Sequence, residues 1–446
     1  MTSPRASRLE ALLEACSGQA MYDMAAELFP LCRSITGDGA RATLARIARD
    51  LPLEIVEVPS GTPVFDWNVP PEWNIREAWI KGPDGSKIVD FADHNLHVVN
   101  YSEPVSATLS LDELRPRLHS LPDRPDWIPY RTTYYDRTWG FCLAHRQLEA
   151  LPEGQYEVLI DSDLAPGSLS YGECVLPGKT TDEVLLSAHT CHPSLANDNL
   201  SGIAVLTALG KALADVPRHF TYRLLFGPGT IGSITWLARN RERAQRIRHG
   251  LVVSCVGDGG GPMYKRSRQG SADIDKAMAH VVGHFSANSR VEDFSPYGYD
   301  ERQYCSPGFD LAVGLFERSK YGNFPEYHTS ADNLDFIAPE HLEASCRMIC
   351  EALDILETNR RPVSRNPYCE PQLGRRGLYQ AMGGDAHRAE RQMAMLWVLN
   401  LADSRHTLLD IAVRSGLPYA RIREAAERLE DKNLLGTQAC PEPMET

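Results

Sequence analysis

The sequence predicts an α/β protein with a β-rich insertion and a helix-turn-helix module at its C-terminal end. From about residue 171 onward, short apolar runs alternate with amphipathic helical segments, which is typical of an α/β sheet. The stretch 65–164 is rich in Trp, Val and Ile and is interrupted by turn sequences such as Pro-Asp-Gly, as expected of strands and hairpins. The last segment has a helical pattern, a short Gly-Leu-Pro turn and a second helical pattern.

Length and composition limit the class of protein. At roughly 100–200 residues per domain, 446 residues correspond to several domains. No apolar run is long enough to cross a bilayer and no export signal is evident, so we expect a cytoplasmic protein without a membrane span. The eleven cysteines form no CxxC pair, which is typical of a reduced protein rather than a disulfide scaffold. The net charge of −13 argues against broad binding to nucleic acid.

The elements follow in order along the chain. Apolar residues recur at helical spacing over 8–51, which predicts two helices separated by the polar turn from Arg33 to Gly39. After the insertion we expect strands at 172–178, 183–189, 220–228 and 250–258, with helices at 201–216 and 233–247. His189, Gly229 and Asp258 then lie at the carboxyl ends of strands, where open α/β sheets bind ligands.

Two polar segments suggest a metal site. His192 and Asp198 lie six residues apart on the loop that follows the strand 183–189, and His328 lies in a second polar segment, 324–337. Asp258 adds another carboxylate at a strand end. Two imidazoles and two carboxylates are the ligands of a hydrolytic zinc site. The alternative is a polar loop with ordinary histidines and a helix N-cap.

The order of these segments resembles that of the zinc aminopeptidases with a co-catalytic metal pair. The matching stretches are HTCHPSLANDNLSG, FGPGTIGS, CVGD and YHTSADNLD. More narrowly, in the stretches CHPSLANDNLSG, TIGSITWL, YDERQ and YHTSADNLDF the chain resembles an aminopeptidase-like family of unassigned function with a β-rich insertion and a C-terminal winged helix. The resemblance implies a mixed-sheet, phosphorylase/hydrolase-like core over 1–64 and 165–360, an inserted domain over 65–164, and a winged helix-turn-helix over 369–446. It also implies one or two zinc ions.

The resemblance assigns ligands residue by residue. Asp198 matches the carboxylate that bridges two metals, Asp258 the carboxylate at one metal, and His328 the imidazole at the other. For the remaining imidazole, His189 matches the ordinary aminopeptidases and His192 matches the narrower family. We prefer His192, in which case His189 lines the site or orders a neighbouring carboxylate.

One departure from the aminopeptidases concerns the general base. They carry a glutamate pair just before the Gly-Ser of this loop, whereas residues 228–233 here contain no carboxylate and Gly229 stands at that place. The nearest substitutes are Asp300 and Glu301, which follow a glycine-containing turn. Tyr327 is a candidate for stabilising an oxyanion. The alternative reading of these residues is a charged surface turn and a packed aromatic ring.

These features predict a metal-dependent amide or peptide hydrolase of the aminopeptidase type. The substrate would be a small peptide or an aminoacylated small molecule with a free amine, and a tailoring role in a biosynthetic pathway fits the narrower family. One alternative is a peptidase-like binding protein that lost its base. A second is a DNA-binding regulator whose peptidase-like domain senses a ligand.

The C-terminal module is expected to contact protein rather than DNA. From 391 to 435 acidic and basic residues nearly cancel, whereas a DNA reader concentrates Lys and Arg on one face. We therefore expect this module to mediate protein contact or homo-oligomerisation. We also expect it to have a core of its own, because a Pro-rich linker precedes it.

Overall fold

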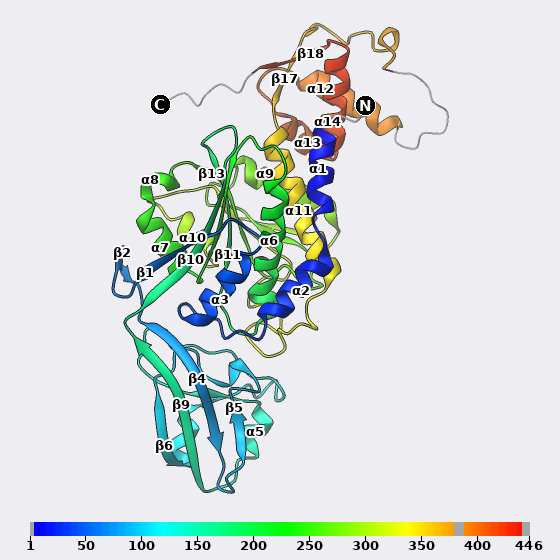
Figure 1. Ribbon diagram of the computed structural model, residues 1–446. Coiled ribbons are helices and arrows are strands. Elements are labelled where there is room, and N and C mark those ends of the chain that lie inside the picture. Colours follow the sequence, from blue (N-terminus) through cyan, green and yellow to red (C-terminus); the bar gives the residue numbers. More distant parts are fainter. Residues whose placement is uncertain (1–3, 379–387, 439–446) are drawn as a thin grey trace.

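The computed structural model describes residues 4–378 and 388–438. The chain forms three bodies that follow one another along the molecule (Figure 1). A β-rich module contains β4 (Glu72–Lys81) and β9 (Gln155–Ala165), a central α/β body follows, and a helical body with α14 (Tyr419–Asp431) lies at the opposite end. This arrangement confirms the predicted fold class. Within the described ranges, no helix has the length and apolar character needed to cross a membrane.

The central body is built on a mixed sheet of eight strands. In spatial order these are β1 (Glu54–Pro59), β10 (Ser168–Leu176), β12 (Thr221–Gly227), β11 (Glu183–His189), β13 (Ile247–Val253), β16 (Val313–Glu317), β14 (Met263–Lys265) and β15 (Arg290–Glu292). β11 runs parallel to β12 and β13, whereas β10 runs antiparallel to β1 and β12. Every residue of β11 is buried, as expected of a parallel strand covered on both faces.

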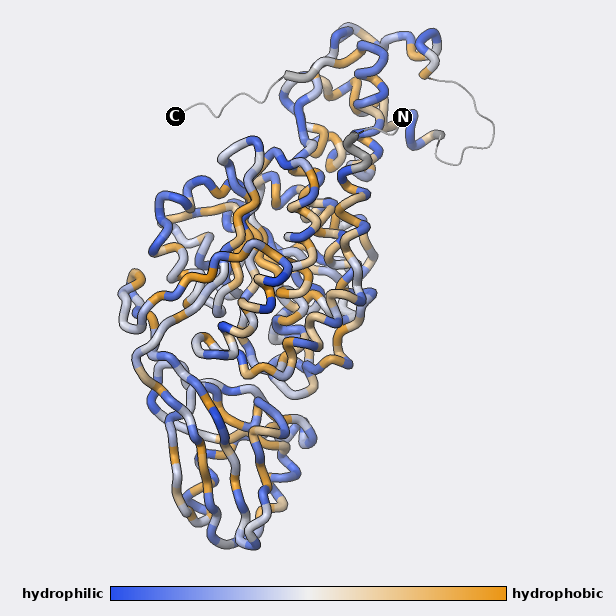
Figure 2. The backbone as a smooth tube through the Cα atoms, viewed as in Figure 1, coloured by the Kyte–Doolittle hydropathy of each residue, from blue (hydrophilic) through white to orange (hydrophobic). Residues whose placement is uncertain are grey.

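The two faces of β11 pack against different helical layers. Val184 and Leu186 belong to an apolar cluster shared with the helices α2 (Gly18–Leu28), α6 (Gly202–Ala214), α9 (Asp273–Phe285) and α11 (Pro339–Thr358). Leu185 faces the other layer, with Trp236 of α7 (Ile231–Arg239) and Tyr304 of α10 (Glu301–Tyr304). Figure 2 shows hydrophobic residues gathered along these central strands. The carboxyl end of β11 is therefore held between two packed layers.

The N-terminal segment forms three helices instead of the two expected. They are α1 (Pro4–Glu14), α2 and α3 (Asp38–Ile47). The chain breaks at Ser17, whose hydroxyl accepts a hydrogen bond from the Ala20 backbone N–H and caps α2. The polar turn that begins at Arg33 separates α2 from α3, and its first residues are buried. Its polar groups point into the protein, Arg33 toward the loop after β11 and Ser34 and Thr36 toward the β-rich module.

The β-rich module is a four-stranded antiparallel sheet. Its spatial order is β5 (Lys87–Asp90), β4, β9 and β6 (Val105–Ser110), around a core that includes Ile80, Phe141 and Val158. β9 leads almost directly into β10 of the central sheet. The other short elements of the described chain are β2 (Pro63–Val64), β3 (Trp67–Asn68), β7 (Leu118–His119), β8 (Phe141–Cys142), α4 (Leu111–Leu114), α5 (His145–Glu149), α8 (Arg241–Ala244), the 3₁₀ turns η1 (Asn95–His97), η2 (Arg115–Arg117) and η4 (Gly374–Arg376), and the π-helical turn η3 (Ala196–Ser201).

The C-terminal body is a winged helix. Its helices are α12 (Arg388–Leu401), α13 (Leu408–Ser415) and α14, and its wing pairs β17 (Arg361–Ser364) with β18 (Leu435–Gln438). Thr407 and Asp410 form a reciprocal cap at the start of α13. Gly416 ends that helix with a φ of 69°, a conformation that glycine adopts without strain. Because β17 pairs with β18, the winged helix begins upstream of residue 369.

The winged helix is docked on the central body through α14. The Tyr419 backbone N–H donates to His280 Nε2 of α9 (3.0 Å), and Arg423 pairs with Asp354 of α11 (2.5 Å). Apolar residues of both bodies, such as Ile422 of α14 and Leu353 of α11, belong to one continuous buried cluster. The expectation of a separate core for this module is therefore wrong, because α9 and α11 present apolar surface directly to α13 and α14.

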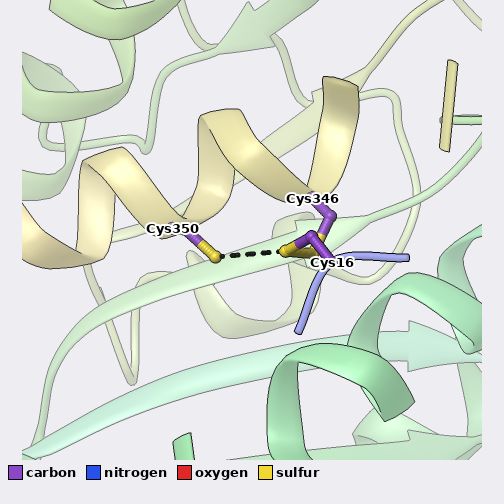
Figure 3. Close-up of side chains that lie close together, drawn as sticks. All are labelled: Cys16, Cys346 and Cys350. Atoms are coloured by element: carbon purple, nitrogen blue, oxygen red, sulfur yellow. Dashed lines mark hydrogen bonds between the residues drawn. A yellow bond between two sulfur atoms is a disulfide. The ribbon is translucent and has the colours of Figure 1, made fainter. Parts of the chain in front are cut away.

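A disulfide joins two distant parts of the central body. Cys16, between α1 and α2, is bonded to Cys346 of α11 (Figure 3). Cys350 follows Cys346 by one helical turn, and its Sγ lies 3.6 Å from Cys16 Sγ. The composition pointed to free thiols and gave no indication of this bond, because the two cysteines are 330 residues apart and share no motif.

Candidate metal centre

Three imidazoles converge on the carboxylate of Asp198 at the carboxyl end of β11. His189 Nε2 lies 2.8 Å from Oδ1. His328 Nε2 lies 3.1 Å from Oδ2, and His192 Nε2 lies 3.8 Å from the same oxygen. The ligand atoms of His189, His192 and Asp198 all lie within 4.8 Å of one another. The structure thus brings both candidate histidines to the carboxylate, on opposite oxygens.

The charge states of this group fit a zinc ion. Burial lowers the pKa of His192 well below its ordinary value, which leaves a neutral imidazole able to bind a metal. Burial alone would raise the pKa of Asp198, but hydrogen bonds from His189 and His328 hold it well below its ordinary value. Neutral imidazole nitrogens and an ionised carboxylate are zinc ligands, and the carboxylate presents one oxygen to each side of the group.

Asp258 lies outside this group. Its Oδ1 accepts hydrogen bonds from Ser319 Oγ (2.6 Å) and the Gly260 backbone N–H (2.6 Å), and its Oδ2 accepts one from Asn197 Nδ2 (2.7 Å). Because β13 already ends at Val253, Asp258 is on the following loop and not at the strand end. The structure therefore gives Asp258 a supporting position, in which it fixes the residue before Asp198.

Two residues given no role in the sequence analysis hold the histidine loop in place. The Asp332 carboxylate accepts hydrogen bonds from the backbone N–H groups of Asn197 (2.6 Å) and Asp198 (3.0 Å), and burial raises its pKa to about 8. Arg33, from the polar turn between α2 and α3, is fully buried and donates to the His192 carbonyl at 2.7 Å. The polarity of both segments was visible in the sequence, but their convergence on this loop was not.

Tyr130 of the β-rich module completes the group. Its hydroxyl lies 2.9 Å from His192 Nδ1, and its backbone N–H donates to the His328 carbonyl (2.8 Å). Its ring packs against both imidazoles, with centroid distances of 4.6 and 5.1 Å. A partner on Nδ1 fixes the ring and directs Nε2 toward the metal position. Sequence reasoning missed Tyr130, because no motif links the module to the histidine loop.

We expect Tyr130→Phe to weaken zinc binding by about 10–100-fold, the usual effect of removing a group that orients a ligand. The measurement is competition with a chromophoric chelator at several pH values. Tyr134→Phe is the matched control. The Tyr134 hydroxyl contacts the Tyr130 hydroxyl (2.7 Å), but in the described ranges Tyr130 is the only tyrosine that is hydrogen-bonded to His192. Equal zinc affinity in wild type and Tyr130→Phe would contradict this role.

Asp300 lies at the loop where the aminopeptidases carry their glutamates. Its Oδ1 accepts hydrogen bonds from the Thr230 backbone N–H (2.8 Å) and Ser233 Oγ (3.1 Å), at the start of α7. Burial raises the pKa of Asp300, while His189 and these hydrogen bonds oppose the rise. A Cβ on Gly229 would lie 3.4 Å from Cys191 Sγ and 3.7 Å from His189 Cβ, so Gly229 faces the same space. Asp300 thus places a carboxylate beside the loop position where Gly229 lacks one.

Glu301 is directed elsewhere. Its side chain is fully buried, and its Oε1 lies 2.6 Å from Lys265 Nζ in an ion pair. Burial raises the pKa of Glu301, and the charge of Lys265 opposes the rise. Glu301 is therefore engaged in an internal ion pair, and its neighbour Asp300 is the better placed of the two for proton transfer.

Tyr327 stacks on His328, with ring centroids 3.9 Å apart and an interplanar angle of 14°. Its oxygen accepts a hydrogen bond from the Tyr299 hydroxyl (3.3 Å), so its own proton is free to be donated. Burial raises the pKa of Tyr327 above its ordinary value, which keeps the hydroxyl protonated. Tyr299 in turn stacks on His189 at 4.9 Å. Together with Tyr130, these tyrosine rings pack against all three imidazoles.

The chain matches two family models. A model described as a domain of unknown function, DUF4910, matches residues 22–359, and one described as a winged helix-turn-helix matches residues 360–437. A Clostridium acetobutylicum protein described as a putative polysaccharide biosynthesis protein with an aminopeptidase-like domain is 49% identical over 419 residues, which cover 94% of this chain and 96% of that protein.

Solved structures show the same fold. A putative peptidase from Clostridium acetobutylicum superposes with a TM-score of 0.90 at 47% identity, covering 97% of this chain and 99% of that one. The zinc aminopeptidase BSAP from Bacillus subtilis superposes with a TM-score of 0.56 at 14% identity, covering 76% of this chain and 94% of that one. At that identity the second similarity concerns the fold alone.

Proposed function

Because this chain belongs to the family defined by the domain of unknown function DUF4910, with an aminopeptidase-like fold and a C-terminal winged helix, we propose that it is a metal-dependent amide hydrolase. The substrate would carry an aminoacyl or peptidyl group with a free amine. The observation that carries the proposal is the convergence of three imidazoles on the buried Asp198 carboxylate, beside the Asp300 carboxylate.

In this proposal His189, His192, His328 and Asp198 hold one or two zinc ions. Zinc bound there would polarise the scissile carbonyl and lower the pKa of water. Asp300 accepts the proton of the attacking water through Oδ2, since Oδ1 is held by Thr230 and Ser233. Tyr327 donates its free hydroxyl proton as a hydrogen bond to the developing oxyanion.

The relative's description suggests where such a reaction would be used. That Clostridium acetobutylicum protein is described as a putative polysaccharide biosynthesis protein. We therefore propose a tailoring step, in which an aminoacyl group is removed from a small molecule on a biosynthetic pathway. His328 lies on the open side of the group, since 31% of its side chain is exposed compared with 1% for His189. The substrate would enter past His328 and Tyr327.

The test is hydrolysis of a panel of aminoacyl anilides by the purified protein, measured together with its zinc content. We expect activity in the zinc-loaded protein, loss on dialysis against chelator, and recovery when zinc is returned. N-acetylated anilides serve as the control, because they lack the free amine. Zinc binding without hydrolysis of any anilide or aminoacylated sugar would instead support a peptidase-like binding protein.

The contacts of α14 argue against a DNA-binding regulator. In helix-turn-helix proteins the N-terminal residues of the second helix contact base edges. Here the first two turns of α14 contact the chain's own central body, through Tyr419 with His280 and through Arg423 with Asp354. We therefore propose a protein-contact role for the winged helix, either within the chain or between copies of it.

A further inference from the structure

A basic surface stands out on this acidic protein. Five arginines lie within the ten residues 239–248, in which Glu242 is the single acidic residue, although the whole chain has a net charge of −13. This stretch covers the end of α7 and all of α8. A hollow of about 500 Å³ is lined by four of these arginines, Arg239, Arg241, Arg243 and Arg246. Asn240 and Glu242 also line it. We call it the basic hollow.

The charges of the basic hollow are largely uncompensated. Across residues 4–378 and 388–438, no carboxylate forms an ion pair with Arg239, Arg241 or Arg246, and Arg243 lies 3.9 Å from Glu173. Arg248 differs, because it lies outside the hollow and pairs with Asp182 at 3.0 Å. Four guanidinium groups therefore share a hollow with one carboxylate, Glu242, and three of them form no ion pair with the described residues, which suits them to bind phosphate through paired N–H donors.

An aromatic pocket of about 330 Å³ adjoins the basic hollow and shares Arg241 with it. Phe65 and Trp67 of the β2–β3 turn line it from one side and are 52% and 48% exposed, and Phe309 packs edge-on to Phe65 at 5.9 Å. The guanidinium carbon of Arg241 lies 6.0 Å from the centre of the Phe65 ring. The β2 strand lies beside α7 in Figure 1.

Polar groups also line the aromatic pocket, where they can form hydrogen bonds to a bound ring compound. Asp66, Gln303 and Ser306 line this pocket between the aromatic side chains. Phe65 has a φ of 59°, a conformation that a bulky residue adopts at a cost, and its ring is nevertheless held half exposed. Exposed aromatic faces beside a few polar groups are typical of small-molecule sites.

We propose that the basic hollow and the aromatic pocket together form a second binding site for a phosphorylated ring compound, a nucleotide or a sugar phosphate. Its phosphate groups bind the arginines, and its ring stacks on Phe65 and Trp67. The phosphate end of this site is separate from the metal centre, because Asp300 contacts the start of α7 and the basic hollow lies at the end of that nine-residue helix, about 13 Å away. The proposal does not depend on hydrolysis.

The test is calorimetric binding of UDP, glucose 1-phosphate, inorganic pyrophosphate and uridine to the full-length, zinc-loaded protein. We expect UDP or glucose 1-phosphate to bind at least tenfold more tightly than both pyrophosphate and uridine; which of the two binds identifies the source of the ring. Arg241→Gln combined with Arg246→Gln should weaken that binding at least tenfold without changing zinc content. Arg248→Gln, the matched control from the same stretch, should bind as the wild type does.

A second variant tests the aromatic pocket. Gly308 lines this pocket, and a Cβ added to it would have no neighbouring atom within 4 Å. Because its φ is not positive, Gly308→Trp should fill the pocket without backbone strain. We expect it to reduce affinity for the ring compound to that of pyrophosphate, and Gly283→Trp, at an equally open glycine of α9, to have no effect. The proposal is overturned if neither ring compound exceeds pyrophosphate, if Arg248→Gln weakens binding equally, or if Gly308→Trp leaves the affinity intact.

Discussion

Replacing Asp198 with asparagine is expected to abolish zinc binding and hydrolysis together. Both carboxylate oxygens face imidazole nitrogens, His189 on one side and His328 on the other, so Asp198 is the shared acceptor of the group. An asparagine retains the shape but removes the charge and turns an N–H group toward one of the imidazoles. Removing a group that only orients a ligand costs about 10–100-fold, and loss of the central ligand should cost more. Zinc content by atomic absorption and anilide hydrolysis measure the two effects.

Asp258→Asn is the informative control. Its carboxylate is bound by Ser319, Gly260 and Asn197 rather than by the imidazoles, so this variant should retain zinc even if its stability falls. His189→Ala and His192→Ala should each lose zinc, since both histidines lie within 4.8 Å of Asp198. Retention of zinc in Asp198→Asn, or its loss in Asp258→Asn alone, would show that the metal lies elsewhere.

The sequence contains enough information to predict four neighbouring strands of the eight-stranded sheet, β10 to β13, and the histidine loop, because these depend on local pattern. The buried run of β11 ends at His189, and the polar loop that follows carries His192 and Asp198. The second polar segment supplied the candidate His328, but this residue lies eleven residues beyond the end of β16, so its position beside Asp198 depends on tertiary packing.

The supporting residues could not be predicted, because each comes from a distant segment whose approach depends on tertiary packing. Tyr130 reaches His192 from the β-rich module, and Arg33 reaches it from the turn between α2 and α3. Asp258 shows the opposite error: spacing placed it at a strand end, but β13 stops five residues earlier. The Asp258 carboxylate therefore lies on the loop after β13, where it contacts Ser319 and Asn197 rather than the imidazoles.

Asp300 and Glu301 illustrate the limit of sequence patterns most directly. They are neighbours in the chain, and both are acidic, so the sequence offers no basis for choosing between them. They stand at the start of α10, where consecutive side chains point about 100° apart. One therefore reaches the loop at Thr230 and the other reaches Lys265. The rotation between consecutive residues of α10 decides which of the two carboxylates faces the Thr230 loop, and the spacing of acidic residues in the sequence does not predict it.

This divergence leads to different expected results for the two carboxylates. Asp300→Asn should reduce kcat by about 10²–10⁴-fold, the contribution of a general base, with zinc content unchanged. Glu301→Gln should act mainly on stability, by up to about 3–5 kcal/mol, because the buried Lys265 ammonium loses this carboxylate and keeps its hydrogen bonds to the Ser295 and Tyr297 carbonyls. Steady-state kinetics and thermal unfolding of both variants separate the two roles. Loss of kcat in Glu301→Gln at unchanged stability would reverse the assignment.

The pH profile and a rescue variant test the role of Asp300 further. A base must be ionised, so activity should fall as the pH drops below the pKa of Asp300, which burial raises above its ordinary value. This acidic limb should be absent from the residual activity of Asp300→Asn. Gly229 has room for a side chain that points toward His189, so adding Gly229→Glu to Asp300→Asn returns a carboxylate to the same space and should recover part of kcat. Full activity in Asp300→Asn, with the acidic limb intact, would show that another group takes the proton.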